Sequence, residues 1–209
     1  MHATMNAPSL REQFGDIDVY LFDQLLRGRL TSGMRVLDAG CGAGRNLHYL
    51  MRAGFDVSGI DESPAAIDAT RRLAARLAPH LAPTVFRVEP VETCSFADAS
   101  FDFVISSAVL HFARDETHFQ MMLDEMWRVL RSGGMLFARL ASTIGMPAEN
   151  FEPWGERRFH LPDGSQRFLV DEEFLMAHGA RLNAQLGDPI KTTVVQNARC
   201  MTTWLLRKA

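Results

Sequence analysis

The chain has 209 residues, a length that most often folds as one domain around one core. Apolar residues make up 47% and charged residues 22% of the chain, which is typical of a globular protein and excludes a disordered or collagen-like one. The 22 basic residues face 25 acidic ones, for a net charge of -3, so general electrostatic binding to nucleic acid is not expected. We therefore predict a single domain over residues 1–209.

The cysteines and the first residues bear on where the protein works. Cys41, Cys94 and Cys200 are an odd number of thiols without C-x-x-C spacing, which argues against a disulfide framework and against a zinc site. The opening sequence MHATMNAPSL lacks the charged and apolar regions of an export signal, and no apolar run approaches the ~20 residues of a membrane span. We expect a cytoplasmic protein without a metal or a membrane partner.

The first predicted elements are a helix, a strand and a second helix. Apolar residues at helical spacing place an amphipathic helix at 17–30, within an N-terminal cap segment, 15–31. The short apolar run 34–38 predicts a strand that enters a glycine-rich turn. The helix behind that turn is expected to end at Gly54.

The same unit then repeats. A second strand is predicted at 55–60. Ser63 is a good N-cap and Pro64 suits the first helical position, so a helix is predicted over 64–78. Strands alternating with helices at this spacing need crossover connections, which favours a mainly parallel sheet.

Three further strands and one helix continue the alternation. The strands are predicted at 85–88, 101–106 and 135–141. The helix is predicted at 116–130, with Ser132-Gly133-Gly134 ending it. The predicted fold class is therefore α/β, a doubly wound, Rossmann-like sheet with helices on both faces.

The alternation lapses over 142–170, which we interpret as a substrate cover inserted after the fifth strand. Pro162-Asp163-Gly164 has the residues of a turn between two short strands. The segment also carries aromatic and basic residues, namely Phe151, Trp154, Arg157, Arg158, Phe159 and His160. These side chains either line a pocket for an apolar or anionic acceptor or belong to a solvated surface hairpin.

The C-terminal part should complete the sheet. Asp171 is a good N-cap for a short helix over 172–178, which Gly179 is expected to end. Two late strand-like stretches, 181–186 and 192–206, are predicted to form an antiparallel edge.

The turn after the first strand carries the sequence DAGCGAGRN at 38–46, at the edge where open parallel sheets bind ligands. Glycines there let a ligand approach the backbone. The dinucleotide fingerprint G-x-G-x-x-G, counted from Gly40, would put its third glycine at position 45. The chain has Arg45 there, and its third glycine, Gly44, comes one residue earlier. S-adenosylmethionine has no pyrophosphate and carries an ammonium and a sulfonium instead. An acidic residue such as Asp38 therefore suits this cationic cofactor.

A second acidic position follows the second strand. Asp61 stands twenty-one residues after Gly40, where a carboxylate can accept hydrogen bonds from both hydroxyls of a ribose. Glu62, beside it, is a second candidate for the same role.

Four motifs together resemble the class I S-adenosylmethionine-dependent methyltransferases. They are VLDAGCGAG at 36–44, GIDES at 59–63, SFDFVISSAVLHF at 100–112 and RVLRSGG at 128–134. The resemblance covers about residues 34–141 and implies a seven-stranded sheet with an antiparallel last strand. It also implies that the glycine-rich turn holds the amino-acid part of the cofactor and Asp61 the ribose. Within the superfamily, the GRN and VLHF sequences look like the tellurite-resistance methyltransferases.

The resemblance and the spacing together give a set of expected cofactor contacts. They are Asp38, Gly40, Cys41, Gly42, Gly44, Asn46, Asp61, Glu62, Ser63, Val91, Glu92 and Ser106. Members of the superfamily usually place an acidic residue just after the third strand, against the adenine amino group. Pro90 occupies that position here, so Glu89 or Glu92 must substitute or the contact is missing.

The sequence says less about the methyl acceptor and the catalytic base than about the cofactor. Enzymes that methylate base amino groups resemble one another in an N-P-P-Y or D-P-P-Y stretch after the fourth strand, where this chain has Ser-Ser-Ala-Val at 106–109. His111 is the leading base candidate because it follows the fourth strand and imidazole titrates near neutrality; the alternative is that it only caps or packs. Tyr20 and Arg29 on the N-terminal helix either reach the cofactor carboxylate or only cover the sheet.

The sequence therefore predicts a methyltransferase that uses S-adenosyl-L-methionine and acts on a small molecule. Since transfer from a sulfonium releases a neutral thioether, alignment of a good nucleophile can supply most of the acceleration. Two alternatives stay open, a nicotinamide-dependent oxidoreductase of the same fold class and a regulator that binds the cofactor without turnover.

Overall fold

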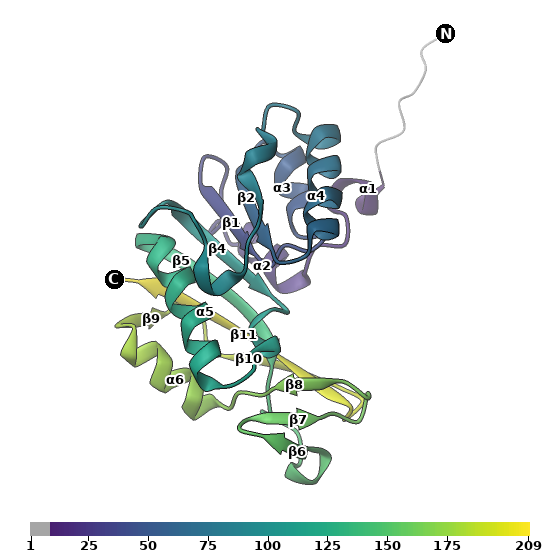
Figure 1. Ribbon diagram of the computed structural model, residues 1–209, viewed down its shortest axis with the longest axis vertical. Coiled ribbons are helices and arrows are strands. Elements are labelled where there is room, and N and C mark those ends of the chain that lie inside the picture. The colour runs from purple at the N-terminus through teal and green to yellow at the C-terminus, as the bar shows by residue number, and fades with distance from the viewer. Residues whose placement is uncertain (1–8) are drawn as a thin grey trace.

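A computed structural model describes residues 9–209. Residues 1–8, which hold most of the segment predicted to lack an export signal, lie outside this part. A twisted central sheet runs between two layers of helices, and a smaller sheet projects from one end (Figure 1). Within residues 9–209, no helix combines the length and the apolar character needed to cross a membrane.

The central sheet has the strand order β10-β11-β5-β4-β1-β2-β3, with β9 also paired to β11. Its parallel strands are β1 (Arg35–Ala39), β2 (Asp56–Asp61), β3 (Phe86–Val88), β4 (Phe101–Ser107) and β5 (Leu130–Ala141). Its remaining strands are β9 (Ala184–Leu186), β10 (Lys191–Val195) and β11 (Arg199–Lys208). The last strand, β11, is antiparallel to all its partners, as predicted.

The sheet has eight strands where seven were expected, because one edge position is divided. β9 and β10 pair with successive parts of β11 and run in the same direction. Between them, Gly187 still donates to the Leu205 carbonyl at 2.8 Å, whereas Pro189 has no N–H to give. The two short strands therefore occupy the place of one interrupted edge strand.

The helices cover both faces of the sheet. The α-helices are α1 (Leu10–Phe14), α2 (Val19–Leu26), α3 (Leu47–Arg52), α4 (Pro64–Leu77), α5 (Glu116–Val129) and α6 (Glu172–Arg181). Single 3₁₀ turns are η1 (Pro83–Val85), η2 (Val91–Thr93), η3 (Leu110–Phe112) and η4 (Ala148–Asn150). Val36 and Phe103 pack with α2, α3 and α4, whereas Leu37 and Val104 pack with α5 and α6. Successive side chains of a strand point to opposite faces, so the central strands are apolar throughout.

Several predicted boundaries were wrong. The N-terminal helix predicted at 17–30 covers only Val19–Leu26, and α1 precedes it behind a capping box at Ser9. The helix predicted at 116–130 ends at Val129 and passes directly into β5, so residues 132–134 belong to the strand.

Two C-terminal predictions also need correction. Gly179 does not end α6, which continues to Arg181, and Asn183 at φ 52° supplies the left-handed residue beyond it. The stretch 192–206 is two strands, because Gln196 and Asn197, both at φ 51°, form a tight turn between β10 and β11.

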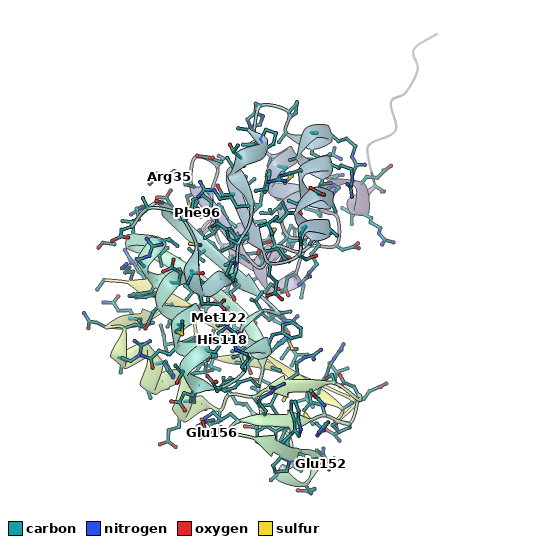
Figure 2. All side chains as sticks on the ribbon, in the orientation of Figure 1. Arg35, Phe96, His118, Met122, Glu152 and Glu156 are labelled. Carbon is teal, nitrogen blue, oxygen red and sulfur yellow. The ribbon has the colours of Figure 1, made fainter. Side chains whose placement is uncertain are left out.

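The segment 142–170 contains a separate small sheet of β6 (Glu152–Gly155), β7 (Arg158–His160) and β8 (Gln166–Phe168). The predicted turn at Pro162-Asp163-Gly164 is confirmed, since it joins the antiparallel strands β7 and β8. Phe151, Leu161 and Leu169 bury their side chains in a core that this segment shares with Cys200 of β11. The edge strand β6 is exposed, and Figure 2 labels Glu152 at its start and Glu156 just after its end.

The N-cap of α4 gives the first testable expectation. The Ser63 hydroxyl accepts a hydrogen bond from the Ala66 N–H at 3.3 Å. Ser63→Ala should lower the free energy of unfolding by about 1 kcal/mol, whereas Ser63→Asp, which keeps an acceptor, should stay within about 0.5 kcal/mol of wild type. Urea denaturation of the three proteins measures this, and equal losses in both variants would contradict the capping role.

Candidate functional site

The site lies where the order of strands along the sheet reverses, between β1 and β4. The chain after β1 turns toward β2, and the chain after β4 turns toward β5, so the two connections leave a crevice between them. Gly40, at φ 82°, lies at its floor, where an added Cβ would come within 2.4 Å of Val109 Cγ2. Only glycine fits there, for reasons of both conformation and space.

A cavity of about 770 Å³ opens over this crevice. It brings together many of the predicted cofactor contacts, namely Gly40, Cys41, Gly42, Asn46, Asp61, Glu62, Val91 and Glu92. Its lining also includes residues that were not among the predicted cofactor contacts, namely Ala43, Arg45, Pro90, Ser107, Ala108, Val109, Phe112, Arg114, His118 and Met122.

Five residues of the predicted set do not line the cavity, namely Asp38, Gly44, Ser63, Ser106 and His111. Gly44 is packed against Thr70 and Leu73 of α4. Ser63 is engaged as an N-cap. The cofactor roles predicted for these residues stay predictions.

Asp38 is the most unusual ionisable group in the site. Its carboxylate is 1% exposed, and neither oxygen has a hydrogen-bond partner within the described residues. Ser106, on the neighbouring strand β4, is equally buried, and its hydroxyl also has no partner there. Burial raises the pKa of Asp38 to about 7, and the charge of Asp61 adds to the rise while Arg45 opposes it. A cation above the loop would stabilise the ionised form.

Asp61 holds the glycine-rich loop in place. One of its carboxylate oxygens accepts from the Gly42 N–H at 2.9 Å and the other from the Ser63 N–H at 3.0 Å. Thr70 of α4 donates to the Gly42 carbonyl at 2.8 Å. The loop is therefore fixed from both sides, and Asp61 keeps lone pairs for a ligand.

A buried carboxylate on the N-terminal side, Asp18, closes the other end of the loop. Its N–H donates to the Asn46 side chain at 3.0 Å, and its carboxylate accepts from Arg139 at 3.0 Å and from the Ser107 hydroxyl at 3.3 Å. Arg45, which lines the cavity, donates to the same Ser107 hydroxyl at 2.9 Å. These residues come from separate elements, so no local pattern could have predicted the cluster.

The N-terminal residues weighed for cofactor binding have other partners. Arg29 forms an ion pair with Asp188 at 2.7 Å. Tyr20 forms a hydroxyl–hydroxyl hydrogen bond with Thr193, and the guanidinium of Arg139 lies 5.2 Å from the centre of its ring. Neither Tyr20 nor Arg29 lines the cavity, so the structure favours the covering interpretation for both.

His111 is buried beside the cavity rather than in its wall. Its Nδ1 accepts from the Ala141 N–H at 3.2 Å, which ties η3 to the end of β5. Burial lowers the pKa of His111 to about 3, and the positive charges of Arg167 and Arg139 lower it further. The side chain is therefore neutral near pH 7, and its observed partner is structural.

The small sheet contacts the cavity lining at Phe112. The guanidinium of Arg167 lies 4.8 Å from the centre of the Phe112 ring, and Phe112 lines the cavity. None of the six aromatic and basic residues singled out between 151 and 160 lines it. Arg157, for example, pairs with Asp171 at 2.8 Å and so supports the start of α6.

Comparisons with known proteins agree with this geometry. Residues 37–138 match the family model described as Methyltransferase domain. The ubiquinone biosynthesis O-methyltransferase of Methylocella silvestris is 34% identical over 110 residues, which are 53% of this chain and 41% of that protein. The enzyme of the same name from Sinorhizobium medicae is 30% identical over 162 residues, 74% of this chain and 63% of that protein. The chain thus spans less than two thirds of either relative.

Solved structures share the fold at lower identity. One is 1,6-didemethyltoxoflavin-N1-methyltransferase from Burkholderia thailandensis with bound S-adenosylhomocysteine, at 20% identity and a TM-score of 0.66 over 88% of this chain and 75% of that one. Another is TehB from Haemophilus influenzae, at 18% identity and a TM-score of 0.67 over 92% of this chain and 63% of that one.

The raised pKa of Asp38 predicts a pH-dependent stability. In the unfolded chain the pKa of an aspartate is about 3.9. From about pH 4 to about pH 7, the unfolded state therefore loses the carboxyl proton of Asp38 while the folded state keeps it. Wild type therefore loses stability as the pH rises through that window. Asp38→Asn removes this loss. Relative to wild type, its free energy of unfolding should rise by up to about 4 kcal/mol between about pH 4 and about pH 7, and the difference should stay constant above about pH 7. Urea denaturation at several pH values tests this, and parallel stability curves would refute it.

Proposed function

Because the chain belongs to the class I S-adenosylmethionine-dependent methyltransferase superfamily, we propose that it transfers a methyl group from S-adenosyl-L-methionine to a small-molecule acceptor. The observation that carries the proposal is the sequence of groups along the cavity. The glycine loop follows β1, Asp61 ends β2 and Glu92 follows β3, and these three strands are neighbours in the sheet. An elongated ligand with a cationic end and a ribose fits that order.

The residues present also fit the cofactor chemically. A Cβ built on Gly42 meets no protein atom within 4 Å, so this edge of the loop is open to a ligand. The unpartnered Asp38 carboxylate beneath the loop favours an ammonium group above it, and Arg45 in the cavity wall is a candidate partner for the cofactor carboxylate. Asp61 is the candidate for the ribose hydroxyls.

When bound, the cofactor supplies an electrophilic methyl group whose departure leaves a neutral thioether. The chain then has to orient the acceptor and to exclude water. We propose that positioning by the crevice residues Ser107 to Val109 dominates catalysis, since the candidate base His111 is neutral, buried and already bonded to Ala141. His111 is at most an auxiliary base in this scheme.

The acceptor is proposed to enter from the β4 and β5 side, because the cofactor groups occupy β1 to β3. We propose that segment 142–170 and the cap segment 15–31 close over it, with the Arg167–Phe112 contact as the point where the small sheet meets the cavity. The relatives are named O-methyltransferases, so acceptors with an oxygen nucleophile are the first class to assay. Chalcogen oxyanions are the second class, because of the predicted likeness to the tellurite-resistance enzymes. A cytoplasmic location also stays a prediction.

Binding of the demethylated product tests the cofactor assignment. Isothermal titration should show S-adenosylhomocysteine binding to wild type, with NAD much weaker. Gly42→Val should abolish this binding because its side chain would enter the ligand space, and Asp61→Ala should weaken it roughly 10- to 150-fold through lost charge-assisted hydrogen bonds.

Gly54→Val is the matched control for Gly42→Val. Gly54 also has a positive φ and open space at its Cβ, but it ends α3 away from the cavity, so this variant carries the backbone strain without the steric block. Equal affinities in folded Gly42→Val and Gly54→Val would defeat the placement, and tight NAD binding would favour the oxidoreductase.

The role of His111 can be measured once an acceptor is known. If positioning dominates, His111→Ala should reduce kcat by less than roughly tenfold, and the rate should follow the ionisation of the acceptor, whereas a general base typically contributes about 10² to 10⁴ in rate. A loss above a hundredfold with unchanged cofactor affinity would make His111 the base.

A further inference from the structure

A second cavity lies at the opposite end of the sheet from the first. Its volume is about 420 Å³, and it opens where β1, β4 and β5 begin and where β11 ends. Figure 2 labels Arg35, the first residue of β1, at this end of the sheet. The two cavities have no lining residue in common, so the second one is separate from the candidate active site.

An irregularity in β5 makes room for this cavity. On β4 only Asp102 separates two paired residues, whereas the whole stretch 131–134 of β5 separates their partners. Extra residues in one strand interrupt the ladder and redirect side chains. Here they bring Arg131 and Gly133 into the cavity lining.

Guanidinium groups outnumber carboxylates in the lining. Arg29 after α2, Arg131 of β5 and Arg207 of β11 contribute the cations. The carboxylate of Asp102 stands against them, but both of its oxygens are engaged. One accepts from the Arg35 N–H at 2.7 Å, and the other accepts from Nε of Arg131. The described lining residues therefore carry an excess of positive charge.

The three cations differ in how far they are already bonded. Arg29 donates to both oxygens of Asp188, at 2.7 Å and 3.1 Å. Arg131 also donates from Nη1 to the Ser132 carbonyl at 2.8 Å and keeps Nη2 without a partner among residues 9–209. The exposed guanidinium of Arg207 has neither a hydrogen bond nor an ion pair in the same range. Arg207 is therefore the cation of this lining that is fully available to a ligand.

Gln185 stands beside Arg207 as a second available donor. The two residues are register partners in the antiparallel pair of β9 and β11, so their side chains project from the same face of the sheet. The side-chain amide of Gln185 has no partner in the described part of the chain. An oxyanion placed here accepts from the guanidinium and the amide together.

Apolar side chains form the rest of the wall. Met135 is the partner of Arg207 on β5 and shares its face. Met34 and Leu186 extend this apolar lining. Gly187 lets the wall close, because a Cβ there would come within 2.8 Å of Met135 Cε. The cavity therefore suits an anion that carries a small apolar body better than a bare ion.

We propose that this second cavity binds a small organic oxyanion, a phosphate ester or a carboxylate, through Arg207, Gln185 and Nη2 of Arg131. The apolar body of the ligand lies on Met34 and Leu186. Hydrogen bonds from a guanidinium to an oxyanion are charge-assisted, so the site selects an anion over a neutral molecule of similar shape. None of these residues is assigned to the cofactor, so the inference is independent of the proposed function.

Three probes test the site by ¹H–¹⁵N NMR titration of the whole chain. They are phenyl phosphate, inorganic phosphate, which lacks the ring, and benzyl alcohol, which lacks the charge. Phenyl phosphate should shift the amide signals of Gly133 and Gly187, which line the cavity, and should bind roughly tenfold or more tighter than benzyl alcohol. Inorganic phosphate should shift the same signals with lower affinity.

Variants of two arginines on β11 separate the cavity from the overall charge. Arg207→Gln removes the available cation and should weaken phenyl phosphate binding roughly 10- to 150-fold. Arg199→Gln is the matched control, because Arg199 is also exposed but lies at the other end of the strand, outside the cavity lining. It should change the affinity by less than about twofold, since solvent and salt screen a distant exposed charge.

Gln185→Met keeps the length of the side chain and removes its donor, so it should weaken phenyl phosphate binding by a smaller factor, roughly 2- to 10-fold. An unchanged affinity in this variant overturns the role of Gln185. The replaced side chains are exposed, so all three variants should keep the fold, and thermal unfolding checks this.

Other results contradict the site or one of its parts. Equal affinities of phenyl phosphate for folded Arg207→Gln and Arg199→Gln overturn the site, as do shift changes confined to Gly40 and Gly42 of the first cavity. Equal affinities for phenyl phosphate and benzyl alcohol overturn the selection of an anion. Equal affinities for phenyl phosphate and inorganic phosphate overturn the role of the apolar lining. Absence of binding by all three probes overturns the whole inference.

Discussion

Gly40 and Val109 meet at the floor of the crevice, and the rest of the site is arranged around that contact. The strands β1 and β4 are adjacent, but the chain after each leads to an opposite half of the sheet, so a crevice opens between the two connections. At the floor of this crevice the loop after β1 can approach Val109, which follows β4, only because Gly40 has no side chain. The positive φ of Gly40 turns the chain back, so that its N–H and that of Cys41 both donate to the Ile60 carbonyl, each at 2.9 Å. The loop is thereby tied to β2, where Asp61 completes the attachment.

The second support is the Asp18 cluster, which joins elements that share no local sequence relation. Asp18 precedes α2, Ser107 ends β4, and Arg139 lies on β5. A carboxylate buried to 4% exposure is costly unless it is paired and hydrogen-bonded, and Arg139 and Ser107 supply those partners. The N-terminal helix is thus attached to the sheet by charge as well as by the apolar packing of Leu21.

What the sequence predicted well depends on local signals. The glycine-rich turn, the place of Asp61 at the end of β2 and the Ser63 cap follow from residue types at short spacing, and the buried strands follow from apolar runs. The sequence did not reveal pairs such as Asp18 with Arg139, 121 positions apart, or Glu92 with His118, because only the completed fold brings them together. Boundaries were wrong where neighbouring structure decided the outcome, as at Gly179, which stays helical against Trp204 and Leu206.

Cys41 belongs to the lining of the same cavity that is proposed to hold an electrophilic methyl donor, and its sulfur packs against Gly59 of β2. A thiolate there would compete with the acceptor for the methyl group, and the enzyme would inactivate itself by alkylation. Burial raises the pKa of Cys41 far above its usual range, and the negative charges of Asp38 and Asp61 raise it further. The sulfur therefore stays a protonated thiol, a poor nucleophile. The packing that holds the glycine-rich loop against β2 therefore also lowers the reactivity of the sulfur beside the proposed methyl donor.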